Sequence, residues 1–239
     1  MQILTGANLS SVAYPAGPLA YPIPASTGPS EDRQIDLGGT DLAFARNAQF
    51  YGEGDSSTYL FQITSGLART YRMAPDGRRQ IIAFYVPGDL FGFELADSHS
   101  LSAEAVTAAR ARVIKRATII NAAASNERIA NQLWISLGRE IRRNQDHILK
   151  LSEPAPVRIA SFLLEIGHRI PGTDATALPI PRQDIADYLN LRLETVSRTM
   201  TKIARSGAIE LSNRRKITIR SRTILWQMVN WLKPSHEFG

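Results

Sequence analysis

Three side chains in the last quarter of the chain could read the edges of DNA bases: Glu194, Ser197 and Arg198. An arginine fork can donate to O6 and N7 of guanine together, a carboxylate can accept from the N4 amino group of cytosine, and a hydroxyl can donate or accept. Spacings of three and four residues place all three on one face of an α-helix. These residues therefore predict hydrogen bonding in the major groove of DNA.

Two short helices joined by a tight turn are expected to present this face. The first is predicted over 182–189, after Pro181, whose missing N–H does no harm at a helix start. Asn190 follows where the turn needs a left-handed backbone, which Asn adopts more readily than most residues. The second helix has one apolar face and one polar face, made respectively of Val196, Met200 and Ile203 and of Glu194, Ser197, Arg198, Thr201 and Arg205. This pattern is typical of a helix-turn-helix, but an ordinary helical hairpin with a solvated charged face would give a similar one.

A β-hairpin is predicted directly after the second helix. Ser206-Gly207 ends the helix, and apolar or alternating runs at 208–211 and 216–219 flank the basic turn Ser212-Asn213-Arg214-Arg215. A helix-turn-helix followed by such a hairpin is a winged helix. Its side chains Arg214, Arg215 and Lys216 would lie where DNA phosphates pass, and phosphate neutralisation supplies much of the non-specific affinity. The alternative is that this turn is merely a soluble loop.

Composition narrows the class of protein. The 239-residue chain has a formal net charge of +6, of which residues 152–239, with 13 Lys+Arg against 8 Asp+Glu, carry +5. A basic excess beside the candidate reading helix is typical of nucleic-acid binding. The absence of cysteine excludes disulfides, thiolate zinc sites, cysteine-held iron–sulfur clusters and cysteine nucleophiles. Because neither a secretory signal nor an apolar run of about 20 residues is present, we expect a cytoplasmic protein with no membrane partner.

The first half of the chain is expected to form an arm and then a β-roll or jelly roll. Residues 1–30 carry no charged side chain and five prolines, which predicts a flexible or extended arm. From about 36 to 120, turn signals recur every 11 to 13 residues and separate strand-like runs at 59–64, 67–73 and 80–86. Short, evenly spaced strands favour such a barrel, which often holds a small ligand.

A long helix is predicted between about 125 and 152, where no proline occurs. Alternating spacings of three and four residues give it a coiled-coil seam, made of Trp134, Leu137, Ile141, Asn144, Ile148 and Leu151. The polar Asn144 would cost stability there but could fix the register of a two-stranded pair. We expect the helix to pair with its twin; a single helix lying on its own barrel is the alternative.

The predicted fold class is α+β, with an N-terminal β-roll, a long dimerisation helix and a C-terminal winged helix-turn-helix. A further helix is expected at 157–169, a short strand at 178–180 and a last helix at 224–232. The expected division is an arm over 1–30, the β-roll over 31–122, the dimerisation helix over 123–153 and the winged helix-turn-helix domain over 154–239.

This order of parts resembles the family of the cyclic-AMP receptor protein and the fumarate–nitrate regulator, over roughly residues 36–232. The motifs that carry the resemblance are PGDLFGFE at 87–94, RQDIADYL at 182–189, LETVSR at 193–198 and SGAIEL at 206–211. Within the family the chain is most similar to the FixK-type regulators. The resemblance implies a cyclic-nucleotide-binding-like β-roll and a homodimeric transcription activator.

The resemblance also implies roles for single residues. Positions that match the family's base contacts are Glu194, Ser197 and Arg198, and positions that match its phosphate contacts are Arg182, Gln183 and Thr195. The Glu-Ser-Arg combination is like that of members that read TTGAT-type half-sites. Two recognition helices related by a twofold axis would enter successive major grooves about 34 Å apart, so the expected site is a palindrome.

Departures from the family pattern concern ligands. Members that bind cyclic nucleotides carry Glu directly after a cassette glycine and an Arg-Ser pair further on. Here Phe93 follows Gly92, Glu94 comes one place late, and Leu101-Ser102 replaces the pair. An apolar side chain cannot neutralise a buried phosphate, so nucleotide binding is not expected. The oxygen-sensing cluster of the fumarate–nitrate regulator needs cysteines, and the four histidines here, at 99, 147, 168 and 236, are scattered. We expect no cofactor and no metal.

The expected partners are double-stranded DNA at a palindromic promoter site, a second copy of the chain, and RNA polymerase. Relatives touch the polymerase through a region that corresponds to the turn Asp76-Gly77-Arg78. The resemblance implies an effector-independent activator of genes for low-oxygen respiration; a regulator gated by an unrecognised small molecule in the β-roll is the alternative. An enzyme on the barrel would need convergent catalytic groups, which no spacing indicates, and an architectural DNA-binding protein would show little base preference.

Overall fold

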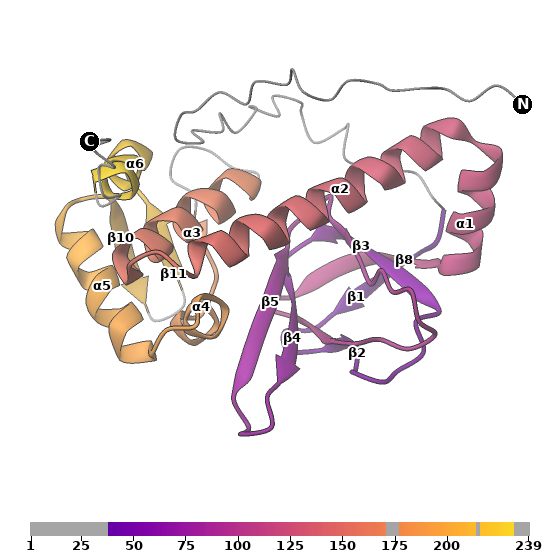
Figure 1. The fold of residues 1–239 in the computed structure, drawn as a ribbon, viewed down its shortest axis with the longest axis horizontal. Helices are drawn as coiled ribbons and strands as arrows, with labels where there is room; N and C mark the ends of the chain where they lie inside the picture. The colour runs from indigo at the N-terminus through magenta and orange to yellow at the C-terminus, as the bar shows by residue number, and fades with distance from the viewer. Residues whose placement is uncertain (1–37, 171–176, 214–215, 232–239) are drawn as a thin grey trace, which may run out of the picture.

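Three units follow one another in the computed structural model, which describes residues 38–170, 177–213 and 216–231 (Figure 1). A barrel of two β-sheets leads into a long helix, and a helical domain with a small sheet lies at the far end of that helix. The predicted α+β fold is confirmed. The predicted arm over 1–30 lies outside the described residues, as do Arg214 and Arg215.

Eight strands form the β-roll and pair antiparallel in two four-stranded sheets, in the orders β1-β8-β3-β6 and β2-β7-β4-β5. They are β1 (Thr40–Phe44), β2 (Gln49–Tyr51), β3 (Tyr59–Ser65), β4 (Ala68–Met73), β5 (Arg79–Tyr85), β6 (Leu90–Phe91), β7 (Ser102–Ala105) and β8 (Ala109–Lys115). Gly66 turns the chain from β3 to β4 at a φ of +82°, where a Cβ would lie 2.4 Å from the carbonyl oxygen of Ala108. The strands predicted at 59–64, 67–73 and 80–86 are confirmed to within one residue at each end.

Aromatic rings fill the space between the two sheets. Phe61 and Phe91 stack with centroids 5.4 Å apart, and Tyr85 stacks on Phe91 at 4.6 Å. Tyr51 stacks on His99 at 3.5 Å, and all five side chains are buried. Offset stacking of this kind adds about 0.5–1.5 kcal/mol per pair beyond the burial of apolar area. The interior of the β-roll is therefore a packed aromatic core.

Two helices leave the β-roll. The first, α1 (Arg116–Ser125), was not predicted from the sequence; it follows β8 directly, and Ile119 anchors it in a buried cluster with Leu60 and Ile114. Asn126 then caps α2 (Glu127–Lys150), because its side chain accepts from two backbone N–H groups of the first turn. α2 runs from the β-roll to the C-terminal domain (Figure 1). Among the described helices, none is long and apolar enough to cross a membrane.

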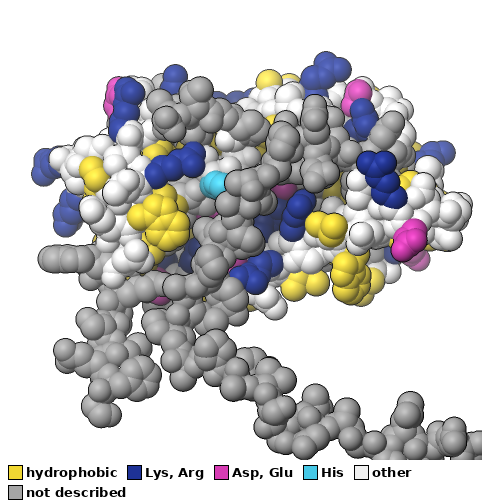
Figure 2. Space-filling model, turned by 90° about the horizontal axis from the view of Figure 1, so that it is seen from above, with side chains coloured by type: hydrophobic (Ala, Val, Ile, Leu, Met, Phe, Trp, Pro, Cys, Tyr) yellow, Lys and Arg dark blue, Asp and Glu magenta, His cyan; other side chains and the backbone are white. Residues whose placement is uncertain are grey.

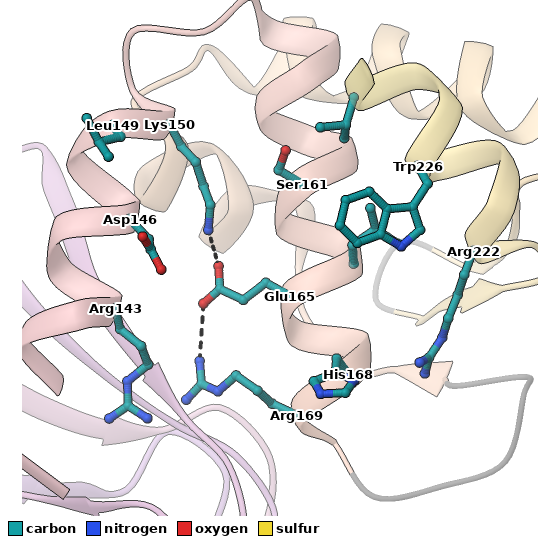
Figure 3. Close-up of a pocket in the computed structure, with 12 residues that line it drawn as sticks. Arg143, Asp146, Leu149, Lys150, Ser161, Glu165, His168, Arg169, Arg222 and Trp226 are labelled. Atoms are coloured by element: carbon teal, nitrogen blue, oxygen red, sulfur yellow. Dashed lines mark hydrogen bonds and ion pairs between the residues drawn. The ribbon is translucent and has the colours of Figure 1, made fainter. Parts of the chain in front are cut away.

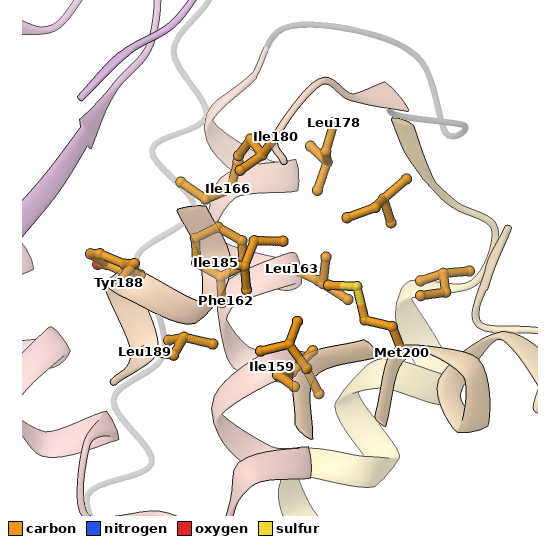
Figure 4. Packing of buried hydrophobic residues seen from close by; sticks show 14 of the residues in the cluster. Ile159, Phe162, Leu163, Ile166, Leu178, Ile180, Ile185, Tyr188, Leu189 and Met200 are labelled. Atoms are coloured by element: carbon orange, nitrogen blue, oxygen red, sulfur yellow. The ribbon is translucent and has the colours of Figure 1, made fainter. Parts of the chain in front are cut away.

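The C-terminal domain packs four helices and a three-stranded sheet around one core. The elements are α3 (Ala155–Arg169), β9 (Ala177–Leu178), α4 (Arg182–Leu189), α5 (Leu193–Arg205), β10 (Ile209–Asn213), β11 (Lys216–Ile219) and α6 (Arg222–Trp231). Figure 4 shows α3 supplying Phe162 and Leu163 to this core, where they meet Ile185 of α4 and Met200 of α5. β10 and β11 pair antiparallel as the predicted wing, except that Ser212 and Asn213 continue the strand instead of forming the turn.

Asp89, between β5 and β6, ties the β-roll to the helices. Its carboxylate accepts from Arg143 of α2 at 3.0 Å and from Arg169 of α3 at 2.6 Å. Burial alone raises the pKa of Asp89, but the two guanidinium groups outweigh burial and hold that pKa below its usual value. A carboxyl with a depressed folded-state pKa stabilises the fold above its ordinary pKa, and this contribution is lost as the pH falls through the folded pKa.

Replacing Asp89 with Asn should therefore destabilise the protein at pH 7 and make much less difference in acid. We expect a loss of about 1–3 kcal/mol at pH 7, because charge-assisted hydrogen bonds to two arginines are weakened. Urea unfolding between pH 7 and pH 2 measures this, with the gap to the parent protein closing below about pH 4. Asp146→Asn, at a half-exposed carboxylate paired only within α2, is the control. A gap that stays constant down to pH 2 would contradict the assignment of Asp89 as the charged link.

Candidate nucleic-acid interface

Asn190 makes the turn that joins α4 to α5. Its φ of 51° and ψ of 50° are left-handed, as predicted, and the backbone N–H groups of Asn190 and Leu191 both donate to the carbonyl oxygen of Ala186. Ile185 and Leu189 are fully buried and hold α4 on the core. The sequence thus fixes both the turn and the place where α5 begins.

α5 has the two faces that its sequence predicts. Val196, Met200 and Ile203 are buried against the core, while Arg198 and Arg205 on the opposite side are exposed. Ser197 is half-buried, so its hydroxyl lies at the edge of the polar face. Burial of one apolar stripe anchors the helix and leaves the other face available to a groove.

Glu194 and Arg198 form an ion pair on the exposed face of α5. Arg198 Nη2 lies 2.6 Å from Glu194 Oε1, and the two side chains are 78% and 69% exposed. Pairs in water contribute little and open at small cost. The guanidinium can therefore exchange its carboxylate partner for a base edge, and the carboxylate is freed to accept from an amino group.

Leu193 is a candidate contact that the sequence analysis missed. It is the first residue of α5 and 43% exposed, beside Glu194. An apolar side chain on a reading face can contact the methyl group of thymine. The signal was present in the sequence, because Leu193 lies four residues before Ser197 and thus one helical turn away on the same face.

The predicted phosphate contacts are less uniform than the base-reading set. Arg182 and Thr195, at the starts of α4 and α5, are half-buried, and Lys216 at the start of β11 is exposed. Gln183 is exposed, and its amide donates to Asp187 at 2.6 Å. Arg214 and Arg215 lie outside the described residues. The phosphate contacts of these six residues remain predictions.

The predicted seam of α2 is open to solvent in the single chain. Trp134, Ile141 and Ile148, seven residues apart, are 76%, 59% and 67% exposed, and the intervening seam residues Leu137, Asn144 and Leu151 are half-buried. Figure 2, viewed from above Figure 1, shows hydrophobic side chains on the surface among Lys and Arg side chains. A large apolar side chain every seventh residue on an exposed helix is typical of a surface that a second helix covers.

The turn Asp76-Gly77-Arg78 stands exposed at the tip of the β4–β5 hairpin. Gly77 has a φ of 78°, and Arg78 Nε donates to Asp76 Oδ2 at 2.7 Å. Hydrogen bonds from the backbone N–H and the side chain of Arg78 lower the pKa of Asp76. The turn thus presents an exposed pair of opposite charges to the solvent, and its contact with RNA polymerase remains a prediction.

A cavity of about 520 Å³ lies between α2, α3 and α6 (Figure 3). Its apolar wall includes Leu149 and Trp226, which are 69% and 44% exposed. Glu165 projects into it and binds both Lys150 and Arg169, as the dashed lines in Figure 3 mark. Lys150 and Arg169 are therefore already ion-paired within the protein, Arg169 to Asp89 as well, and most of the cavity surface is apolar.

The chain is similar to known domains and proteins along most of its length. Residues 42–126 match the cyclic nucleotide-binding domain family, and residues 157–228 match the Crp-like helix-turn-helix domain family. The nitrogen fixation regulation protein FixK of Azorhizobium caulinodans is 39% identical over 193 residues, which cover 78% of each chain. The protein of the same name from Rhizobium meliloti is 37% identical over 76% of this chain and 83% of its own.

A solved structure agrees with these matches. FixK2 from Bradyrhizobium japonicum superposes with a TM-score of 0.75 at 38% identity, over 80% of this chain and 97% of that one. The relatives are transcription regulators and not enzymes. With a β-roll, a long helix and a winged helix-turn-helix in one chain, this protein belongs to the CRP/FNR family of DNA-binding transcription regulators and is of the FixK type.

Proposed function

We propose that this protein is a homodimeric transcription activator that reads a palindromic TTGAT-type site without a small-molecule effector. The observation that carries the proposal is the polar face of α5, where exposed Glu194 and Arg198 stand on a fully buried apolar stripe. Since relatives named as nitrogen fixation regulators are 37% and 39% identical to it over 76% and 78% of the chain, we assign its target genes to nitrogen fixation or low-oxygen respiration. Such an activator would act in the cytoplasm, at promoter DNA.

The dimer is supported by the exposed seam of α2. Three large apolar side chains, Trp134, Ile141 and Ile148, repeat every seventh residue and lie more than half exposed in one chain. Two parallel copies of α2 would bury these side chains against each other. They would also bring two copies of α5 to one side of the dimer, as a palindrome requires.

Effector independence is supported by the interior and the cassette of the β-roll. The space between the sheets holds packed rings, Phe61, Tyr85 and Phe91 among them. Glu94 faces Ser100 and accepts from its backbone N–H and its hydroxyl, both at 2.9 Å. Leu101, which replaces the phosphate-binding arginine of nucleotide-binding relatives, has no charge to offer an anion.

Activation would also need a contact with RNA polymerase, for which we propose the exposed turn Asp76-Gly77-Arg78. The exposed carboxylate of Asp76 and guanidinium of Arg78 lie side by side at the tip of the hairpin, where both are open to a partner. When both copies of α5 are bound at a promoter, the turn would lie beside the polymerase.

A binding-site selection from random DNA, with purified protein and no added ligand, tests the function. We expect recovered sequences to be palindromes with half-sites about one helical turn apart, and footprinting to show protection of both halves. Recovery of sequences without dyad symmetry would contradict the dimeric reading mode. Protection that appears only after a cyclic nucleotide is added would contradict effector independence.

The cavity between α2, α3 and α6 favours a second candidate function, that of a regulator gated by an apolar small molecule. Trp226 and Leu149 line this cavity, whereas the rings in the β-roll interior pack against one another. If this function is correct, lipids or aromatic compounds extracted from cells should change the DNA affinity of the parent protein. Trp226→Ala should alter that effect without changing the affinity measured in the absence of ligand. A ligand-free affinity that already saturates promoters at micromolar protein would argue against it.

A further inference from the structure

Four charged side chains hold α4, the first helix of the helix-turn-helix, against the β-roll. We call them the interdomain clamp: Arg69, Arg79, Asp184 and Asp187. Arg69 of β4 donates to Asp184 of α4. Arg79 of β5 donates from Nη2 to Asp184 at 2.6 Å and from both Nε and Nη2 to Asp187, at 2.9 and 2.8 Å. Each arginine comes from the β-roll. Each aspartate comes from the C-terminal domain, which we also call the reading domain, more than 100 residues later.

One half of the clamp is buried and the other half is partly exposed, since the side chains of Arg79 and Asp187 are 24% and 12% exposed. Arg69 is 5% exposed and Asp184 is 2% exposed. The desolvation penalty of a buried ion pair nearly cancels the attraction between its charges, so such a pair adds little to stability. What it does provide is geometry, because two aspartates one turn apart on α4 bind one rigid guanidinium and thereby fix the rotation of the helix.

The β-roll side of the clamp is itself held in place. Arg69 Nη2 donates to Glu104 of β7 at 2.7 Å, and the hydroxyl of Tyr71 donates to the other oxygen of Glu104 at 2.5 Å. The guanidinium of Arg79 lies over the ring of Tyr71, 5.8 Å from its centroid. Both arginines therefore also have partners within one sheet of the β-roll.

An aromatic contact lies beside the clamp. Tyr188 of α4 meets Phe84 of β5 at 5.2 Å and stacks on His147 of α2 at 4.0 Å. Asp89, bound to Arg143 and Arg169, forms a second charged link a short distance away. Three separate contacts are enough to remove both sliding and rotation between two rigid bodies.

We propose that Asp184 and Asp187 are positioning residues, which never touch DNA but fix where α5 points relative to the β-roll. Because α4 passes directly through the Asn190 turn into α5, any rotation of α4 is transmitted to the reading helix. The β-roll is in turn carried by α2, so the clamp sets the separation of the two reading helices in a dimer. This inference rests on the homodimeric function proposed above. In a regulator without an effector, the clamp would fix the orientation of α5 that a bound ligand would otherwise have to fix.

The consequence is a strict preference for one half-site spacing. With the clamp intact, a palindrome whose half-sites are moved apart by one base pair forces either the protein or the DNA to deform. Removing the Arg79 bridge leaves the Arg69–Asp184 bond, the aromatic contact and the Asp89 link in place but loosens the rotation of α4, so the C-terminal domain can turn by a limited angle toward a displaced half-site. Cognate binding should then weaken, because the reading helices must lose orientational freedom when they bind. Displaced sites should be rejected less strongly.

Arg79→Gln tests this in the full-length protein, since it removes the bridge and leaves Asp184 bound to Arg69. We expect about a tenfold loss of affinity for the cognate palindrome, within the usual range of coupling between sites. Discrimination against palindromes lengthened or shortened by one base pair should fall by a similar factor. Asp187→Asn should shift both quantities in the same direction by less, and Arg79→Lys, which keeps the charge but loses the fork, should lie in between.

Arg72→Gln is the matched control. Arg72 lies on β4, is 64% exposed on its side chain and pairs with Glu53, which also belongs to the β-roll. It should bind every spacing as the parent does. Thermal unfolding of each variant separates positioning from folding: an equal loss on all spacings that follows the folded fraction would overturn the proposal.

A distance measurement decides the clamp even if DNA binding fails. The chain has no cysteine, so nitroxides can be attached at Thr118→Cys on α1 and Lys202→Cys on α5, in labelled protein diluted with unlabelled protein. Double electron–electron resonance should give the same narrow distance distribution in the parent and in Arg72→Gln and a broader one in Arg79→Gln. An unchanged distribution in Arg79→Gln would overturn the clamp, whereas absence of ligand-free DNA binding by the parent would overturn only the proposed function.

Discussion

Replacing Ile141 with glutamate is expected to split the protein into monomers that no longer protect a palindromic site. Ile141 is 59% exposed in the single chain, so the monomer loses little by the change. In a paired seam the glutamate would face its own copy, and burying two like charges without partners is costly. Loss of the second half-site removes the avidity of a two-headed protein, so affinity should fall at least about 100-fold.

Sedimentation measures the dissociation, and titration of a palindromic duplex measures the loss of affinity. Arg139→Glu, on the opposite side of α2, introduces the same side chain outside the seam and should leave the protein dimeric. A single half-site duplex should bind the Ile141→Glu protein and the parent within a few-fold of each other. A dimer that survives Ile141→Glu would show that the seam of α2 is not the interface.

Replacing Arg198 with alanine is expected to weaken cognate binding and to relax the choice of one base pair in each half-site. Loss of a bidentate contact to guanine should cost about 1–3 kcal/mol per half-site, or roughly 5- to 150-fold. Glu194 then loses its ion-pair partner, but this costs little stability because its carboxylate is exposed to water. Folding should be unaffected, because Arg198 lies on the open face of α5.

The measurement is a competition among duplexes that carry each base at the contacted position, repeated at several salt concentrations. Arg198→Lys keeps the positive charge without the fork, so it should lose the base preference with little change in the salt dependence. Arg205→Ala, on the same face two turns later, should weaken all duplexes alike. Equal losses on all sequences for Arg198→Ala would identify Arg198 as a phosphate contact.

Much of the reading head could be predicted from the sequence because its determinants are local. The left-handed Asn190, the buried stripe of Val196, Met200 and Ile203, and the paired strands of the wing all depend on neighbours within a few residues. Helix periodicity and turn preference act over that same range. The sequence therefore predicted both the elements and the face of α5 that carries Glu194 and Arg198.

Elements without a local signature were missed. α1 has apolar residues on several sides and no marked polar face, and it is held by Ile119 entering a cluster built from distant strands. The spacing of Leu193 to Ser197 places it on the polar face of α5, but its apolar type suggests burial, and the 43% exposure in the folded chain is what makes it a candidate contact. Burial depends on which segments meet in space, which periodicity along one segment does not specify.

The sequence by itself determined the reading chemistry: which side chains could recognise bases, that they share a helix face, and that a long helix carries an unpaired apolar seam. Only the tertiary structure decided how that face is aimed. Arg69 and Arg79 lie over 100 residues before Asp184 and Asp187, and no spacing connects them. Two segments so far apart become partners only when the sheet that carries one pair of charges folds against the helix that carries the other, so the residues that orient α5 have no local pattern to reveal them.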